Sequence, residues 1–211
     1  MKQTLKQEIF QKRKSLSKEE VIEKSRLIKE NLLSLEEFKK AENIMFYVSF
    51  GNEVDTREAI KELLAKKEKT VIVPYVLENY PILQLSELKN FDWLEPKTFG
   101  ILEPKELYIR EFNYEKIDLI LIPGIVFDKK GYRVGYGHGY YDRFLKILRN
   151  SKGISGTPKI SKKFSRALKK GVKKIGLAFE LQVVDEIPEE EHDVPVNIII
   201  TEKRVLRCNN K

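Results

Sequence analysis

The chain has 211 residues, 41% of them apolar and 34% charged, so it can bury one sizeable core and does not have the composition of a disordered protein. Its single cysteine excludes an internal disulfide, no segment is apolar for long enough to span a membrane, and the charged start lacks the core of a signal peptide. We therefore expect a single-domain cytoplasmic protein that has no membrane partner and no disulfide framework.

The first half of the chain alternates predicted helices and strands. Residues 2–14 form a basic helical segment, and Ser-Lys-Glu-Glu at 17–20 has the capping-box spacing that opens a second helix. The dense apolar run at 43–49 predicts a strand. Residues 55–67 begin with a capping Asp or Thr and predict a third helix.

The remaining strands are nearly continuous in apolar character. They are expected at 70–74, 117–123, 174–179 and 196–201. A continuous apolar sequence is typical of strands that are buried on both faces. In a parallel sheet, the helices between the strands cover both faces. The sequence therefore predicts an α/β fold with an open, mostly parallel sheet and helices on both faces. Residues 80–115 are less regular and predict a short hairpin or an excursion over the sheet.

The stretch Gly-Tyr-Arg-Val-Gly-Tyr-Gly-His-Gly-Tyr-Tyr-Asp-Arg at 131–143 lies where the strand at 117–123 gives way, through a loop, to a predicted helix at 138–148. Ligands of open parallel sheets bind beyond the carboxyl ends of the strands, and a helix N-terminus offers unpaired N–H groups to an anion. Glycines there permit positive φ and remove the β-carbons that keep backbone amides away from a ligand. This stretch predicts a phosphate site.

The stretch matches neither common nucleotide motif. A Walker loop needs Gly-Lys-Ser/Thr, which the chain lacks, and Tyr140 stands where G-x-G-x-x-G requires its third glycine. From chemistry alone, Arg133 supplies positive charge and Asp142 a metal-binding carboxylate. The alternative at this point is an ordinary glycine-rich turn with surface tyrosines.

The net charge of +8 is concentrated in residues 146–174, which hold eleven lysines and arginines and no acidic residue. The rest of the chain is therefore slightly acidic. The segment suits a solvated connection, contact with the anionic tail of a substrate, or nucleic-acid binding. Phe164 is its only aromatic residue, so it lacks a stacking platform, and we expect no nucleic-acid partner.

Residues 123–145, Pro-Gly-Ile-Val-Phe-Asp through Gly-Tyr-Tyr-Asp-Arg-Phe-Leu, resemble the signature of the 5-formyltetrahydrofolate cyclo-ligase family. The lysine-rich first helix, Phe-Gly-Asn-Glu-Val-Asp-Thr at 50–56 and the stretch at 186–201 follow in the order typical of the family. The resemblance implies one domain over 1–211, with a basic insertion near 150–172. It implies cyclisation of 5-formyltetrahydrofolate to 5,10-methenyltetrahydrofolate, with ATP as co-substrate and Mg²⁺ as cofactor, by phosphorylation of the formyl oxygen and attack of N10. A polyglutamate tail on the folate would give the basic segment an anionic partner.

The resemblance also implies residue roles. The expected catalytic residues are Arg133, Tyr140 and Asp142. The expected Mg²⁺ ligands are Asp142 and Asp193. The ATP residues are Lys2, Lys6, Arg133, Val134, Gly135, Tyr136, Gly137, His138, Gly139, Tyr140 and Tyr141. The folate residues are Val48, Phe50, Glu53, Phe99, Tyr136, Gly137, His138, Gly139 and Tyr140.

Without the resemblance, the sequence pattern indicates structural roles for some of these residues. Asp193 would be a solvated acidic turn, and Val48 and Phe99 would be core residues. Two positions depart from the family pattern: Lys6 replaces the usual arginine and loses its bidentate fork, and His138 stands where glycine or lysine is common.

Two other classes of function remain open from the residues. A sugar-phosphate isomerase or CoA-transferase-like enzyme could share the sheet without using ATP, and a basic nucleic-acid-binding module could use residues 146–174. For the enzyme we expect a monomer.

Overall fold

The computed structural model describes residues 2–78, 80, 82–149, 171–190 and 193–208. The predicted basic insertion near 150–172 therefore falls almost entirely outside the described residues. Within the described part, no helix is both long and apolar enough to cross a membrane.

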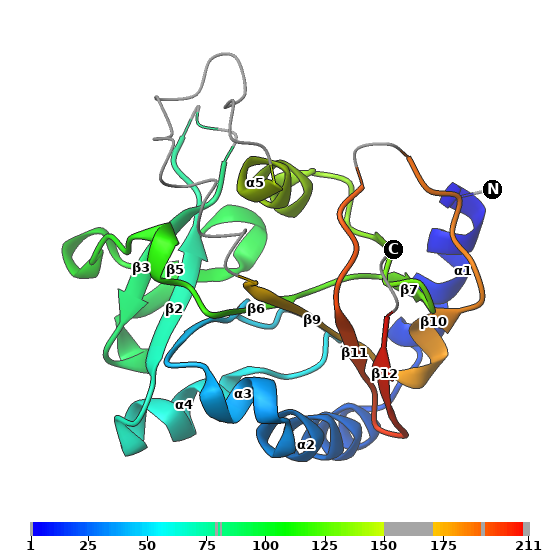
Figure 1. Ribbon diagram of the computed structural model, residues 1–211, viewed down its shortest axis with the longest axis horizontal. Helices are drawn as coiled ribbons and strands as arrows, with labels where there is room; N and C mark the ends of the chain where they lie inside the picture. Colours follow the sequence, from blue (N-terminus) through cyan, green and yellow to red (C-terminus); the bar gives the residue numbers. More distant parts are fainter. Residues whose placement is uncertain (1, 79, 81, 150–170, 191–192, 209–211) are drawn as a thin grey trace.

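A seven-stranded sheet runs through the centre of the molecule (Figure 1). Its order is β12-β11-β9-β6-β1-β2-β3; the five inner strands are mutually parallel, and β12 and β3 pair antiparallel at the two edges. The strands are β1 (Asn43–Met45), β2 (Thr70–Tyr75), β3 (Gln84–Leu88), β6 (Leu119–Ile122), β9 (Lys173–Leu177), β11 (Ile198–Ile200) and β12 (Val205–Arg207). The predicted α/β class with a mostly parallel sheet is confirmed.

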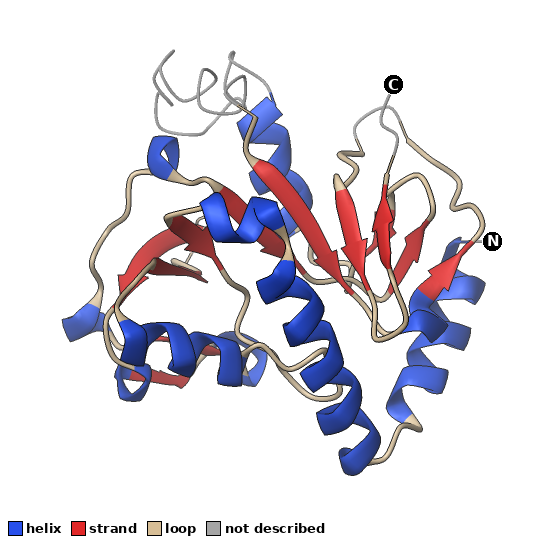
Figure 2. Ribbon diagram, turned by 60° about the horizontal axis from the view of Figure 1, so that its bottom comes forward, coloured by secondary structure: helices blue, strands red, loops and turns tan. Residues whose placement is uncertain are grey.

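Helices cover both faces of this sheet, which explains the unbroken apolar runs of its strands (Figures 1 and 2). Successive residues of β6 belong to different clusters: Leu119 and Leu121 pack with α2, α3 and α4, whereas Ile120 and Ile122 pack with α5. Alternate side chains of a strand point to opposite faces, so a strand between two helical layers needs an apolar residue at every position. The helices are α2 (Lys18–Ser34), α3 (Glu36–Lys40), α4 (Arg57–Lys66) and α5 (Tyr140–Arg149).

Local sequence signals set the starts of two helices, and at the second start one of the two expected capping residues accepts a backbone amide. The capping box before α2 is present, with Ser17 accepting from the Glu20 amide and Glu20 accepting from the Ser17 amide. At α4 the hydroxyl of Thr56 does not cap the helix but donates to the Tyr47 carbonyl at 2.6 Å. Asp55 instead accepts from the amide of Arg57 at 2.8 Å.

One region differs from the expected loop, and the irregular region contains a hairpin, one of the two structures expected there. Residues 124–137 were expected to be loop, but β7 (Val126–Asp128) and β8 (Arg133–Val134) form a small sheet with β10 (Val183–Val184). In the irregular region 80–115, β4 (Leu94–Pro96) and β5 (Leu102–Pro104) form a hairpin, and β5 lies against β2.

The first helix, α1 (Lys2–Lys14), packs on the small sheet (Figure 1). Ile9 is buried with Ile125, Val126 and Ile187. This packing sets α1 beside the loop that follows β8, so basic side chains from the start of the chain reach residues more than a hundred positions away.

Candidate active site

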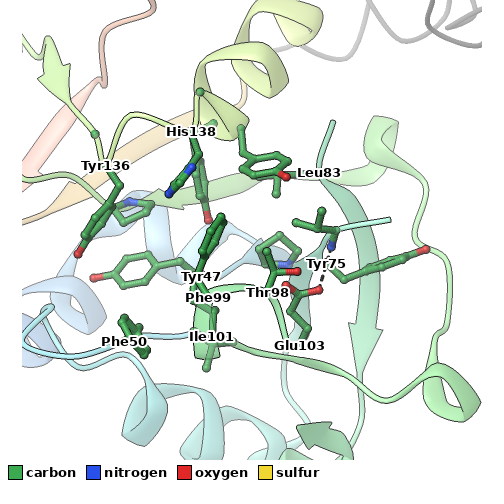
Figure 3. A pocket seen from close by; sticks show the side chains of 18 of the residues that line it. Tyr47, Phe50, Tyr75, Leu83, Thr98, Phe99, Ile101, Glu103, Tyr136 and His138 are labelled. Carbon is green, nitrogen blue, oxygen red and sulfur yellow. Dashed lines mark hydrogen bonds between the residues drawn. The ribbon is translucent and has the colours of Figure 1, made fainter. Parts of the chain in front are cut away.

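A pocket of about 210 Å³ opens at the carboxyl ends of β1, β2 and β6. Val48 follows β1, Tyr75 ends β2 and Val76 comes directly after it, and Pro123 follows β6. The hairpin residues Thr98, Phe99, Ile101 and Glu103 form another wall, and the glycine loop 135–139 forms the rim (Figure 3). The pocket therefore lies where an open parallel sheet is expected to bind its ligand.

The glycine loop uses left-handed backbone at two of its three predicted positions. Gly137 has φ +107° and Gly139 has φ +69°, conformations that L side chains rarely adopt. Gly135 differs from expectation, since it is not among the residues with positive φ and an added β-carbon would meet no atom within 4 Å. The last two glycines thus shape the turn that leads into α5.

Arg133 is the charged centre of the loop. Its side chain is only 4% exposed, donates to the Val194 carbonyl at 3.2 Å and forms an ion pair with Asp142. Burial lowers the pKa of the Arg133 guanidinium, while the carboxylates of Asp142 and Asp193 oppose that shift. A fixed arginine beside two carboxylates at the pocket rim suits an anionic ligand with a divalent cation.

Lys2 joins the same region from the start of α1. Its Nζ lies 2.9 Å from Glu190 and 3.3 Å from Asp193. Partial burial alone would lower the pKa of Lys2, but these two carboxylates raise it. Asp193 is therefore held close to Lys2 and Arg133 and is not the solvated turn that its local sequence suggests.

Lys6 and Arg13 attach α1 to the glycine loop. Lys6 donates to the Tyr136 carbonyl at 2.7 Å. Arg13, only 3% exposed, donates to the Tyr136 hydroxyl at 2.5 Å and to the Gly124 carbonyl at 3.3 Å. Sequence reasoning missed Arg13; the signal was its spacing from Lys2, Lys6 and Ile9, which puts all four on one face of the helix.

Glu53 is a buried carboxyl at one side of the pocket. It is 8% exposed, accepts from the Phe50 amide at 2.9 Å and shares a hydrogen bond with the Tyr136 hydroxyl. Burial raises the pKa of Glu53, and the Phe50 amide, the Tyr136 hydroxyl and the charge of Arg13 each reduce the increase. The protein thus supplies both hydrogen-bond donors and a countercharge to this group.

The raised pKa of Glu53 predicts a pH-dependent effect of its replacement. A carboxyl whose pKa is higher in the folded state stabilises that state at low pH, and this contribution is lost as pH rises through the folded-state pKa. We expect the Tm of Glu53→Gln relative to wild type to increase from pH 4 to pH 7, measured by thermal unfolding. Glu8→Gln, at an exposed position of α1, is the control for loss of a solvated carboxylate. A difference in Tm that is constant or falls with pH would contradict this expectation.

Phe99 and His138 meet across the mouth of the pocket (Figure 3). Their ring centroids are 4.1 Å apart with an interplanar angle of 21°. Phe99 is 58% exposed and has φ +57°, unusual for an aromatic residue, so it is not the core residue that pattern alone suggests. Backbone strain of this kind is often found at ligand sites.

Tyr141 carries the one buried side-chain oxygen or nitrogen among the described residues that has no hydrogen-bond partner. Its ring packs against the clusters on both faces of the sheet, and its hydroxyl lies in the electrostatic field of Glu53 and Arg133. Burial raises the pKa of Tyr141 above its usual value, so the hydroxyl keeps its proton and can donate. A buried orphan donor that lines a pocket is suited to a ligand atom.

The pocket brings together most of the predicted site residues. Lys2, Lys6 and Asp193 do not line it but lie beside it through the contacts described above, and the Val134 side chain packs instead with the cluster around Ile9. Glu103, a buried carboxylate that sequence reasoning did not single out, lines the wall formed by the hairpin. The predicted residues that line the pocket are Val48, Phe50, Glu53, Phe99, Arg133, Gly135, Tyr136, Gly137, His138, Gly139, Tyr140, Tyr141 and Asp142.

Comparison with known proteins gives one consistent result. The model of the 5-formyltetrahydrofolate cyclo-ligase family matches residues 1–202. The chain is 28% identical over 206 residues to the 5-formyltetrahydrofolate cyclo-ligase of Mus musculus, covering 95% of this chain and 93% of that protein. It is 29% identical to the enzyme of the same name from Haemophilus influenzae, covering 92% and 94%. The solution structure of Aquifex aeolicus 5,10-methenyltetrahydrofolate synthetase is similar with a TM-score of 0.76 and 34% identity, covering 100% of this chain and 94% of that one.

Proposed function

The chain belongs to the 5-formyltetrahydrofolate cyclo-ligase family and is a ligase, and on that basis we propose that it uses ATP and Mg²⁺ to convert 5-formyltetrahydrofolate into 5,10-methenyltetrahydrofolate. The observation that carries the proposal is the arrangement of the pocket. A cavity with aromatic and aliphatic walls meets a rim at which Arg133, Lys6 and Lys2 gather from two distant parts of the chain. One end suits a pterin and the other suits phosphates.

The proposed chemistry uses ATP to turn the formyl oxygen into a leaving group. A formamide carbon is a poor electrophile because its nitrogen donates electron density to it. Transfer of the γ-phosphoryl group to the formyl oxygen releases ADP and gives an imidate-like phosphate. The lone pair of N10 then attacks the formyl carbon, the C–O bond breaks, and phosphate departs with the N10 proton. Such a sequence needs positioning and charge neutralisation more than it needs a strong acid or base.

We assign the triphosphate to the rim. Arg133 supplies a buried guanidinium, Lys6 and Lys2 supply ammonium groups from α1, and α5 begins at Tyr140, so the amides of its first turn face the loop. Lys6 donates to a carbonyl of the glycine loop. Lysine at this position lacks the bidentate fork of the arginine that is common in the family, but it places a positive charge at the loop. The proposed nucleotide residues remain Lys2, Lys6 and the stretch from Arg133 through Tyr141.

We assign the folate to the pocket interior. Val48, Phe50 and Glu53 form one wall, and Phe99 can pack on the pterin once its ring parts from His138. The proposal needs only one chain, so we retain the expectation that the enzyme acts as a monomer.

Asp142 and Asp193 fit a magnesium ion by their chemistry. Both carboxylates act on Arg133 at the rim, and Mg²⁺ prefers one or two carboxylates together with substrate phosphates. The described residues contain no cluster of three or more His, Cys, Asp or Glu side chains that could hold a metal ion without other ligands. When bound, the ion would neutralise phosphate charge there.

The proposal predicts a separation of stability from function at Tyr141. Replacing Tyr141 by Phe removes an orphan hydroxyl without changing the ring, so the ligand-free protein should keep or increase its Tm. The same variant should lose about 2- to 10-fold in kcat/KM, because a hydrogen bond to substrate is worth roughly 0.5–1.5 kcal/mol. Tyr108→Phe is the control, since it makes the same change on a ring that stacks on Trp93, and neither of these residues lines the pocket. If Tyr141→Phe has a lower Tm and an unchanged kcat/KM, the Tyr141 hydroxyl does not bind the substrate.

The function itself is tested by absorbance. The protein is incubated with 5-formyltetrahydrofolate, ATP and Mg²⁺, and each component is omitted in turn while methenyl absorbance and ADP are measured. Formation of product only in the complete mixture supports the proposal. Absence of product with folded protein, or product without ATP, would reject it. The sugar-phosphate isomerase and nucleic-acid alternatives receive no support from the family match.

A further inference from the structure

Glu103 is a second buried carboxylate in the pocket, on strand β5 of the hairpin. It is 4% exposed, and its Oε2 accepts from the Val76 amide at 2.9 Å (Figure 3). The ion pairs found among the described residues include none to Glu103. A carboxylate has about four acceptor positions, and burial without enough donors is costly.

Glu53, the other buried carboxyl group that lines the pocket, has different surroundings. The Phe50 amide, the Tyr136 hydroxyl and the charge of Arg13 all act on it. For Glu103 the hydrogen bonds found among the described residues supply one donor, the Val76 amide, in a wall that also contains Tyr75, Thr98 and Ile101. Glu103 therefore has acceptor capacity left for a ligand, whereas Glu53 is largely supplied by the protein.

The proposed substrate has a matching group. The pyrimidine half of a reduced pterin carries N3–H and the 2-amino group side by side, which gives two parallel N–H donors on one edge. A carboxylate can accept both donors, one on each oxygen, in the geometry of a bidentate pair. Resting on the proposed function, we propose that Glu103 binds the N3–H and 2-amino edge of the pterin and sets its orientation in the pocket.

This orientation of the pterin agrees with the position of the residues that are proposed to bind the phosphates of ATP. Glu103 and Tyr136 lie at different ends of the pocket in Figure 3. In a pterin, N5 belongs to the ring fused on the side away from the 2-amino group. Anchoring the pyrimidine edge at Glu103 therefore directs the formyl group on N5 toward the glycine loop and Arg133, where phosphoryl transfer is proposed.

The chain contains a matched control for Glu103. Strand β4 pairs with β5 so that Glu95 lies directly opposite Glu103. Glu95 has a side chain that is 43% exposed, pairs with Lys97, and does not line the pocket. Glu103→Gln and Glu95→Gln thus make the same chemical change on the same hairpin, and glutamine at 103 can still accept from the Val76 amide.

The test combines the variants with a substrate analogue. Binding of 5-formyltetrahydrofolate and of its 2-desamino-2-methyl analogue is measured by equilibrium titration without ATP, and kcat and KM are measured with the natural substrate. We expect Glu103→Gln to weaken folate binding about 10–100-fold, the range for a lost hydrogen bond to a charged group. The KM for ATP, and the binding and Tm of Glu95→Gln, should stay near wild type. Wild type should bind the analogue about tenfold more weakly than the natural folate, and Glu103→Gln should discriminate less than threefold.

Two results would overturn the role of Glu103: tight binding of the natural folate by Glu103→Gln, or discrimination against the analogue as strong as that of wild type. Failure of the proposed function looks different, since wild type would then form no methenyl product. If wild type also does not bind the folate in the titration, the role of Glu103 fails together with the function.

Discussion

Arg133→Met is expected to lower kcat/KM for ATP-dependent cyclisation by about a thousandfold or more, the range for removal of an arginine that stabilises phosphoryl transfer. The guanidinium is 4% exposed, lines the pocket, and is fixed by the Val194 carbonyl and Asp142 before any ligand arrives. Pre-positioned charge in a site with little water stabilises a transition state more than mobile charge does. Loss of Arg133 should therefore reduce kcat as well as affinity for ATP.

Two further variants separate this effect from unfolding and from simple loss of charge. Arg133→Lys keeps one positive charge but loses the planar fork, so it should recover only part of the activity. Arg207→Met removes an exposed arginine that pairs with Glu37 and should leave activity unchanged. Steady-state kinetics on variants with wild-type far-UV circular dichroism give the comparison. A folded Arg133→Met enzyme within fivefold of wild-type kcat/KM would place the phosphates elsewhere.

Gly176→Ala is expected to destabilise the protein by about 1–3 kcal/mol or more, the range for overpacking a core. A β-carbon at Gly176 would lie 2.5 Å from Cε1 of Phe127, and one at Gly124 would lie 2.6 Å from Cε2 of the same ring. Phe127 is fully buried, and Gly176 lies on β9 between β6 and β11. Neither the ring nor the strand can move away without disturbing the central sheet.

This contact also supports the site. Phe127 pairs in register with Arg133, so the ring wedged against two glycines holds the small sheet, and with it Arg133, against the large one. Denaturant unfolding measures the loss, and thermal unfolding should show a fall in Tm of about 2–4 °C for each kcal/mol. Gly135→Ala is the control, because its β-carbon would meet no atom within 4 Å. Adding Phe127→Leu to Gly176→Ala should restore part of the lost stability, because substitutions at residues in contact are not additive. An unchanged Tm in Gly176→Ala would contradict the close contact between Gly176 and the Phe127 ring.

The sequence predicted those features that depend on neighbours along the chain. The Ser17–Glu20 capping box forms because both partners lie within one helical turn. The apolar runs predicted a sheet covered on both faces because each strand position must meet one of two helical layers. The glycine stretch predicted a turn after a strand and before α5, and its left-handed residues at Gly137 and Gly139 follow from the lack of a side chain.

Contacts between distant segments could not be predicted in this way. Arg13 belongs to a helix rich in lysine and would ordinarily be assigned to solvent, yet it is buried against Gly124 and Tyr136 because α1 packs on a small sheet that local patterns did not reveal. Thr56 shows the same limit on a smaller scale. Either Asp55 or Thr56 can cap α4, and the carbonyl of Tyr47 draws the Thr56 hydroxyl inward.

The hairpin shows most clearly what the sequence determined and what the tertiary structure decided. Residues 94–97 and 102–105 both read Leu-Glu-Pro-Lys, so the sequence assigns Glu95 and Glu103 the same local chemistry, and by itself it determined only that each is an acidic residue in a short extended segment. The tertiary structure decided that β5 lies against β2, which leaves Glu95 in solvent and places Glu103 in the pocket beside the Val76 amide. Burial of a charged group depends on which distant backbone and side chains surround it, and no local pattern carries that information.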